Sequence, residues 1–411
     1  MPRLTAIVAA AALAGCAAAA ASPQSSHDSS SPDQPVTLIS DSQCDCFLTN
    51  GTSPGYYSQH MFFDFRSLPQ YASADAPAFV LNESQAAIAP VTSDYFADDR
   101  WNGTWQIQGW DNKNTEGHGL AGNSTVLMVN SQSNIFIQQN ADRPAASQTF
   151  MSMRTKRLPG FQTTAAFQSR AADFHFLSVR ILARTVGSPG AVTAMFTYRE
   201  AAAGVQEADL EVLTRGPRET VQYTNQPGFG PDGRRNTDAS HNTTLPDSLL
   251  WSDWAVHRLD WTSSGSLWFV NGKQTANIST QVPRDPSSLN FNSWSDGGPW
   301  SGNMSLYDEA RLEIQWIDVV YNSTAAADAT HAQRRSGGGG DDHVGPHGRL
   351  VRRKGHPGCK VVCSIDESPE LGRTALLWNS TAARTAGADL RSSMAWLWSL
   401  MFGTVLWYCL V

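Results

Sequence analysis

The 411-residue sequence has no excess of basic residues. Lys and Arg together number 30, against 37 Asp and Glu, which gives a net charge of −7. The basic side chains are scattered, apart from a short run at 349–354. Nucleic-acid binding requires a concentrated positive surface, so we expect no nucleic-acid partner.

Long amphipathic helical patterns are also absent. Short segments with partial polar–apolar alternation and β-branched or aromatic residues recur instead, separated by Gly, Pro, Asn and Ser. They occupy 104–110, 124–130, 134–138, 149–155, 161–168, 174–183, 190–199, 206–213, 219–225, 254–262, 266–270, 290–294 and 311–321. This pattern predicts an all-β sandwich or jelly roll. The dipeptide Asn271-Gly272 predicts a tight hairpin turn.

Cysteine is scarce, with six residues in the chain. Cys16 and Cys409 lie in terminal segments that we expect to be removed by processing. The other four are Cys44, Cys46, Cys359 and Cys363. In an exported chain they imply two disulfides, and we expect the N-terminal pair to join the C-terminal pair. A metal site is the alternative interpretation, and we predict no metal.

The N-terminal segment 1–22 resembles a secretory signal, because a basic residue precedes an apolar run and small residues. The end of this run also fits a bacterial lipobox around Cys16. Residues 23–41 are rich in Ser, Pro, Asp and Gln, which predicts a disordered lead-in. Nine N-x-S/T sequons favour a eukaryotic secretory protein over a bacterial lipoprotein. They begin at Asn50, Asn82, Asn102, Asn123, Asn242, Asn277, Asn303, Asn322 and Asn379.

The C-terminal part divides into three segments by composition. Residues 324–357 contain a glycine run and scattered charges, which predicts a flexible low-complexity insertion. Residues 358–378 are expected to be tied back by disulfides. The segment 379–411 has small residues, a polar spacer and an apolar end, the order of a GPI-attachment signal; a membrane span is the alternative. We therefore expect a secreted or cell-surface protein, and a GPI anchor or another membrane attachment is the expected form of any surface attachment.

Three acids alternate with apolar residues in the segment 206–213. In a strand, Glu207, Asp209 and Glu211 share one face, and Ala208 and Leu210 share the other. Neighbouring carboxylates raise each other's pKa values, and a glycosidase uses one carboxylate and one carboxylic acid. The alternative is a solvated acidic edge of a sheet.

The segments around the acidic strand carry a wider pattern. It comprises 189–198, Val221-Gln222-Tyr223-Thr224-Asn225, Arg258-Leu259-Asp260-Trp261, Phe269-Val270-Asn271-Gly272-Lys273, and the stretch from Asn292-Ser293-Trp294 to Gly302. In order and spacing, this set resembles glycoside hydrolase family 16, the laminarinase and lichenase group, and within it the secreted fungal branch. The resemblance covers about 42–323 and implies a concanavalin A-like β-sandwich jelly roll.

The resemblance implies a retaining mechanism in which Glu207 is the nucleophile, Glu211 the acid/base, and Asp209 controls the ionisation of Glu207. Trp294 and Tyr223 become candidate sugar contacts. The sequence departs from the family pattern at Ala208, where Ile or Val is common, and at Val205, where some members have Trp. By contrast, we expect structural roles for three tryptophans: Trp261, Trp268 and Trp300.

These residues predict a monomeric endo-β-glucanase without a cofactor, acting on β-1,3- or β-1,3/1,4-glucan of cell walls. A cell-wall transglycosylase is an alternative, because the same covalent intermediate serves both reactions. A non-catalytic carbohydrate-binding protein and a structural glycoprotein on the same fold are further alternatives.

Overall fold

The computed structural model describes residues 36–73, 76–113, 119–202, 204–230, 232–325 and 359–380. The expected signal at 1–22, nearly all of the segment 324–357 and the tail beyond residue 380 lie outside these residues. Among the described residues, no helix is both long enough and apolar enough to cross a membrane. Residues 38–39, expected in the disordered lead-in, form a strand instead because they pair with residues 374–375.

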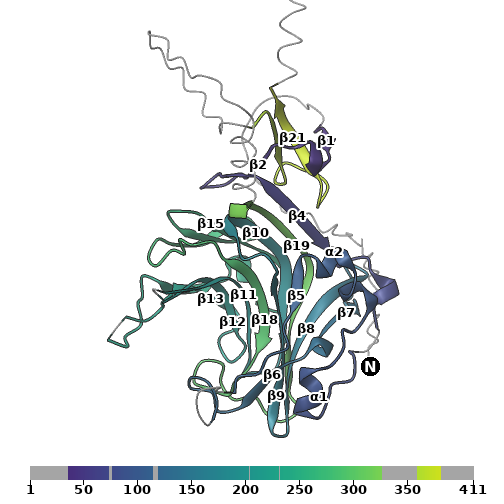
Figure 1. Ribbon diagram of the computed structural model, residues 1–411, viewed down its shortest axis with the longest axis vertical. Helices are drawn as coiled ribbons and strands as arrows, with labels where there is room; N and C mark the ends of the chain where they lie inside the picture. Colours follow the sequence, from purple (N-terminus) through teal and green to yellow (C-terminus); the bar gives the residue numbers. More distant parts are fainter. Residues whose placement is uncertain are drawn as a thin grey trace, which may run out of the picture. The chain divides into compact units, whose positions relative to one another are not determined.

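Two layers of antiparallel strands form the body of the protein (Figure 1). The first layer, here called the cleft sheet, runs in the order β14 (Ser240–Thr244), β13 (Thr220–Gln226), β12 (Gly204–Leu213), β11 (Val192–Ala201), β18 (Ser288–Trp294), β9 (Phe161–Ser169) and β5 (Trp105–Ile107). The acidic segment is therefore an inner strand, β12, with β11 and β13 as neighbours.

The second layer, the outer sheet, runs in the order β17 (Lys273–Ile278), β16 (Ser266–Val270), β15 (Ala255–Trp261), β10 (Phe174–Gly187), β19 (Glu309–Ser323), β8 (Thr149–Leu158) and β7 (Ile135–Gln139). β4 (Gln59–Asp64) pairs with β19, and β6 (Leu127–Asn130) pairs with β9. The predicted hairpin turn joins β16 to β17, and both of its residues, Asn271 and Gly272, have positive φ angles of 47° and 79°.

The helices of the described residues are short. They are α1 (Glu83–Ala87), α2 (Asp99–Asn102) and the 3-10 turns η1 (Asp41–Gln43), η2 (Pro69–Tyr71), η3 (Asp94–Phe96), η4 (Gln132–Asn134) and η5 (Pro246–Ser248). The fold is the all-β jelly-roll sandwich that the strand pattern predicts. One large core fills it, with Leu210 and Phe291 from the cleft sheet and Leu259 and Ile317 from the outer sheet.

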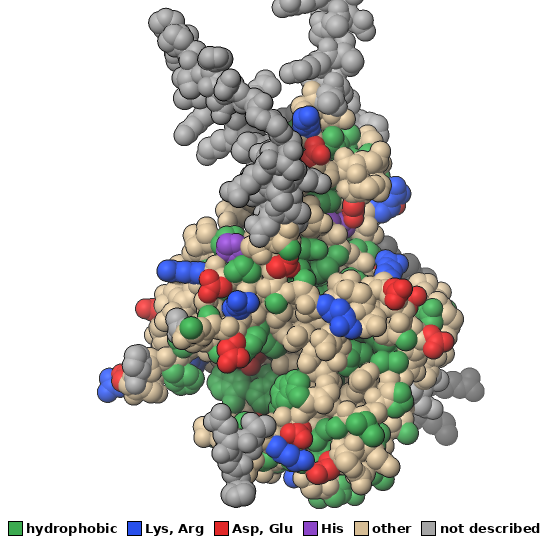
Figure 2. Space-filling model, in the orientation of Figure 1, with side chains coloured by type: hydrophobic (Ala, Val, Ile, Leu, Met, Phe, Trp, Pro, Cys, Tyr) green, Lys and Arg blue, Asp and Glu red, His purple; other side chains and the backbone are tan. Residues whose placement is uncertain are grey.

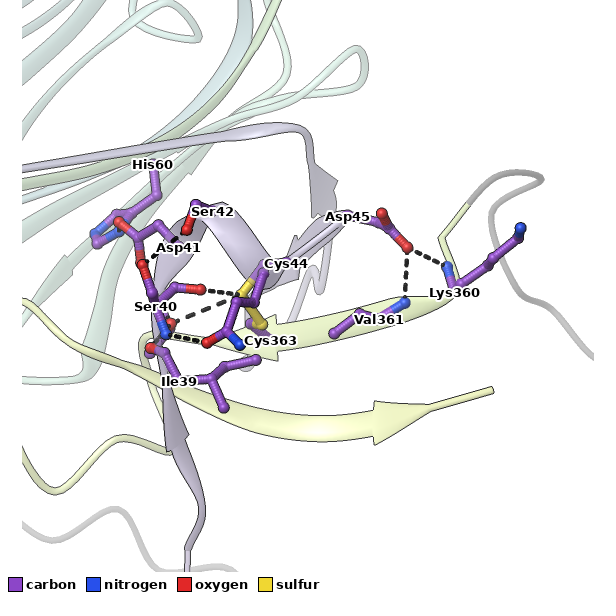
Figure 3. Close-up of a disulfide and its surroundings, with 12 residues drawn as sticks. Ile39, Ser40, Asp41, Ser42, Cys44, Asp45, His60, Lys360, Val361 and Cys363 are labelled. Atoms are coloured by element: carbon purple, nitrogen blue, oxygen red, sulfur yellow. Dashed lines mark hydrogen bonds and ion pairs between the residues drawn. A yellow bond between two sulfur atoms is a disulfide. The ribbon is translucent and has the colours of Figure 1, made fainter. Parts of the chain in front are cut away.

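A separate five-stranded sheet contains both ends of the described chain. Its order is β1 (Leu38–Ile39), β21 (Thr374–Asn379), β20 (Val361–Ser364), β2 (Cys46–Leu48) and β3 (Tyr56–Tyr57). Two disulfides, Cys44–Cys363 and Cys46–Cys359, close it. The N-terminal cysteines thus join the C-terminal cysteines, as the sequence favours. Beside the bonds, Asp45 accepts hydrogen bonds from the backbone N–H groups of Lys360 and Val361 (Figure 3).

Buried charges connect this small sheet to the sandwich. Asp366 forms an ion pair of 2.7 Å with Arg180 of β10, and its other oxygen accepts from the backbone N–H of Asn50. His60 of β4 lies between Asp41 and Asp318, at 2.7 and 2.8 Å. Burial alone would lower the pKa of His60, but the two carboxylates raise it to about 9. The imidazole is therefore charged at neutral pH and holds both acids.

The disulfides predict a non-additive effect on stability. Replacing Cys46 and Cys359 with alanine leaves Cys44–Cys363, which still joins residues 319 positions apart. The unfolded chain then stays closed, so the melting temperature falls only slightly. Replacing all four cysteines frees the loop and lowers the free energy of unfolding by about 5 kcal/mol. Thermal and urea unfolding of the two variants measures the difference. If both variants lose the same free energy of unfolding, the two disulfides do not close the same loop of the unfolded chain.

Candidate active site

The acids of β12 lie on one face of the cleft sheet. Tyr198, Phe196 and Ala194 of β11 stand directly opposite Glu207, Asp209 and Glu211. The intervening residues Ala208 and Leu210 are 0% and 6% exposed and belong to the core. Core packing of Ala208 and Leu210 therefore fixes the direction of the acids. A shift of register by one residue would turn the acids into the core and the two apolar residues into the cleft.

The three acids line a cleft of about 250 Å³. Trp110, Phe196, Met128 and Trp294 supply an apolar wall, and Asn130 and Asn292 supply polar groups. Trp110 is 49% exposed, which leaves its indole ring accessible to a ligand. On the face shown in Figure 2, hydrophobic side chains gather in a patch, whereas charged side chains are scattered around it.

A second cavity, of about 240 Å³, adjoins the cleft on the other side of Glu211. Phe229 and Trp300 form its aromatic part, and Phe229 is 57% exposed. Its polar lining is a hydrogen-bonded group on β13 and β14: Gln222 donates to Thr224 and Ser240, each at 3.1 Å. Arg235 also donates to Ser240, at 2.9 Å. Glu211 is thus the wall shared by the two cavities.

Burial raises the pKa values of all three acids. The pKa of Glu207 rises to about 7, because desolvation and repulsion from Glu211 outweigh a hydrogen bond with Asp209. The pKa of Glu211 also rises to about 7 through desolvation, against a lowering hydrogen bond from Trp300. The pKa of Asp209 is raised well above its usual range by desolvation and then by the charges of both glutamates.

Neutral side chains donate hydrogen bonds to two of the acids. Trp300 donates its indole N–H to Glu211 Oε1 at 3.2 Å, and Gln226 donates to Asp209 Oδ2 at 3.1 Å. Asp209 Oδ1 is buried and has no donor among the described residues. A proton shared with Glu207 would satisfy this oxygen, since the two side chains are close enough to interact and a protonated carboxyl is a donor. No Lys or Arg in the described part of the chain forms an ion pair with these acids.

Two aromatic residues have roles opposite to those expected from the sequence. Tyr223 is not a sugar contact: it is 0% exposed, because it stands opposite Leu210 and points into the core. Its ring stacks on Trp268 at 4.8 Å. Trp300, expected to be structural, lines the second cavity and donates a hydrogen bond to Glu211. Trp294 lines the cleft, and its role as a sugar contact stays a prediction.

Two other tryptophans, Trp261 and Trp268, are fully buried in the core as expected. Trp110 and Phe229, which line the cavities, carry no sequence signal that separates them from core aromatics. Both lie outside regular strands, so strand alternation does not apply to them.

The model of glycosyl hydrolases family 16 matches residues 123–318. This segment is a glycoside hydrolase family 16 domain. It contains β12 with all three acids, as well as Trp294 and Trp300. No curated protein sequence matches the chain.

Solved structures of similar proteins have low sequence identity to this chain. A prokaryotic β-1,3-1,4-glucanase (lichenase) from a mouse hindgut metagenome is 16% identical, with a TM-score of 0.42, over 64% of this chain and 99% of that one. A Bacillus licheniformis β-glucanase is 17% identical, with a TM-score of 0.41, over 54% and 92%. The catalytic domain of a laminarinase from Thermotoga petrophila is 18% identical, with a TM-score of 0.41, over 54% and 92%.

The buried position of Tyr223 predicts a purely structural effect of its substitution. Tyr223→Phe keeps the stacking on Trp268 and loses only the hydrogen bond from Thr275, so the free energy of unfolding falls by about 1 kcal/mol. Tyr223→Ala leaves a cavity in the family 16 domain and costs about 3–5 kcal/mol. Urea unfolding of both variants measures these values. A stability of Tyr223→Ala equal to that of the unsubstituted protein would contradict the core assignment.

Proposed function

We propose that the family 16 domain is a retaining endo-β-glucanase that acts on β-1,3- or mixed β-1,3/1,4-glucan. The observation that carries this proposal is the set of three acids on one face of β12, which line a cleft with aromatic walls and have raised pKa values. The substrate class rests on the resemblance to the laminarinase and lichenase group. The two disulfides support secretion into an oxidising compartment.

In the proposed first step, a Glu207 carboxylate oxygen attacks the anomeric carbon of the glucan. Glu211 donates its proton to the glycosidic oxygen, the bond from the anomeric carbon to that oxygen breaks, and an ester to Glu207 forms. In the second step, Glu211 accepts a proton from water, and the water oxygen displaces Glu207. Retention requires the two carboxyl groups to converge to about 5 Å.

The unequal surroundings of the acids support these roles. Asp209, the most buried of the three at 3% exposed, keeps its proton and donates a hydrogen bond to Glu207, which favours an ionised nucleophile. Glu211 lies between the two cavities, so a leaving sugar in the second cavity has its oxygen beside the acid.

A wall-remodelling transglycosylase is the second candidate function. The second cavity supports it, because Phe229, Trp300 and the polar group around Ser240 form a place for an acceptor sugar. The acceptor hydroxyl would then replace water in the second step. A non-catalytic carbohydrate-binding protein has less support, because buried acids that share protons give a lectin no advantage.

Substitution of the two glutamates tests the proposal. Glu207→Gln removes the nucleophile and abolishes turnover of laminarin or lichenan. Glu211→Gln removes the acid/base and lowers kcat by about 10²–10⁴-fold. Glu219→Gln is the matched control, because Glu219 is exposed and lies outside both cavities. The measurement is the release of reducing ends from laminarin, lichenan and chitin oligomers.

The products separate the candidates. New reducing ends from the unsubstituted protein alone support hydrolysis, and longer oligomers without new reducing ends support transfer. Glucan binding that survives Glu207→Gln, with no product from either protein, would overturn the enzymatic assignment in favour of a carbohydrate-binding protein.

The raised pKa values predict a bell-shaped dependence of kcat/KM on pH. Activity falls at low pH because Glu207 must be ionised, and falls at high pH because Glu211 must hold its proton. Both pKa values are about 7, so the acidic and alkaline limbs lie on either side of that value. Because the two glutamates are coupled, each limb reports the titration of the pair and not of one residue.

Trp300→Phe removes the hydrogen bond that lowers the pKa of Glu211, so the alkaline limb moves to higher pH. Trp110→Phe is the control, because Trp110 lines the cleft without a hydrogen bond to the acids. If the alkaline limb of Trp300→Phe stays where it is in the unsubstituted protein, the assignment of Glu211 as the acid is contradicted.

A further inference from the structure

A row of residues crosses the cleft sheet at the level of Glu211. Asn292 of β18 stands opposite Ala194 of β11, and Ala194 stands opposite Glu211. On the other side, Glu211 stands opposite Gln222 of β13, and Gln222 opposite Asn242 of β14. Directly opposed residues of antiparallel strands project from the same face, so all five belong to the face that carries the acids.

The two cavities follow this row. Ala194 and Asn292 line the cleft on one side of Glu211, and Gln222 lines the second cavity on the other. The row therefore continues past the second cavity to Asn242, which is exposed on β14, the last strand of the sheet. Adjacent strands are about 4.8 Å apart, so Asn242 lies about 10 Å from Glu211 at Cα.

Asn242 begins the sequon Asn242-Thr243-Thr244. Its side chain makes no hydrogen bond with the described residues. The sequon at Asn322 differs, because that amide donates to the carbonyl of Tyr56 and accepts from the backbone N–H of Ser58. The sequon at Asn82 also differs, because Asn82 caps α1 by accepting from Ser84. Because Asn242 is exposed and makes no such contact, its amide is accessible for modification.

We propose that Asn242 carries an N-linked glycan that closes the Glu211 end of the cleft. Its amide nitrogen would displace the pyrophosphate group at the anomeric carbon of a lipid-linked oligosaccharide donor and lose a proton. An oligosaccharide at this position limits how many sugars of the leaving chain fit beyond Glu211. This consequence rests on the proposed glucanase function. The glycan also covers an edge strand that would otherwise offer unpaired backbone groups.

The experiment uses the full chain secreted from a eukaryotic host. Asn242→Gln and Thr244→Ala both abolish the sequon, whereas Thr244→Ser preserves it and is the matched control. Asn277→Gln is a second control, because it removes a sequon from β17 at the edge of the outer sheet. Mass spectrometry of the peptide containing residue 242, before and after enzymatic deglycosylation, gives the occupancy without any need for catalysis.

The second readout is the length of the sugar chains released from laminarin. Loss of the Asn242 glycan lengthens the fragments that carry the reducing end and raises kcat/KM on the polymer several-fold, while Thr244→Ser and Asn277→Gln leave both unchanged. An unmodified Asn242 overturns the proposal, and so does an occupied Asn242 whose removal leaves fragment length and kcat/KM unchanged. A glycosylated protein that hydrolyses no glucan contradicts the proposed function and the glycan's effect on the cleft, but keeps the modification site.

Discussion

The site depends on the packing of one strand between core and solvent. Ala208 and Leu210 are held in the core beneath the cleft, and this packing makes Glu207, Asp209 and Glu211 share the other face. Each carboxylate in these surroundings opposes folding, because burial disfavours its charge. Apolar burial across the two layers offsets that cost, at about 25 cal/mol for each Å² removed from water. The acids are therefore maintained by a core to which they do not contribute.

Within the described residues, these acids form no ion pairs, and this absence is as important for their pKa values as the acids' own proximity. A neighbouring Arg would lower their pKa values and leave all three ionised near neutrality. Elsewhere in the chain, buried acids do have such partners: Asp366 pairs with Arg180, and Asp260 with Arg258. In the cleft, neutral donors from Gln226 and Trp300 take their place. Protons must then be shared among the acids, which acid–base chemistry requires.

Sequence patterns predicted features that depend on local periodicity. The alternation in β12, the Asn271-Gly272 turn and the order of most strands needed no knowledge of distant partners. The edge strand β14 was not predicted, because its sequence is polar throughout. Strand β4 was not predicted either, and its ladder partner, β19, lies more than 240 positions later. The disulfide pairing of the ends followed from cysteine count and position alone.

The errors at Tyr223 and Trp300 have a common physical origin. Tyr223 lies on β13, where strand alternation puts it on the same face as Val221, and its ladder partner is Leu210; both of these residues belong to the core. Trp300 lies outside a strand, and the turn that begins at Gly297, where φ is 68°, carries it to Glu211. A large aromatic side chain suits either a core or a sugar-binding wall, so composition does not separate these roles.

The small sheet shows how a region remote from the acids can still determine their geometry. Its Asp366 pairs with Arg180 of β10 and Arg258 of β15. Asp41, beside the small sheet, pairs with His60 of β4, which also pairs with β19. These are strands of the outer sheet, and the core that orients β12 is packed between that sheet and the cleft sheet. Without Asp366, Arg180 would lack its 2.7 Å ion pair at a position where its side chain is only 9% exposed, and an unpaired buried charge is strongly destabilising. The disulfides thus keep in place a carboxylate that stabilises the outer sheet against which the cleft sheet packs.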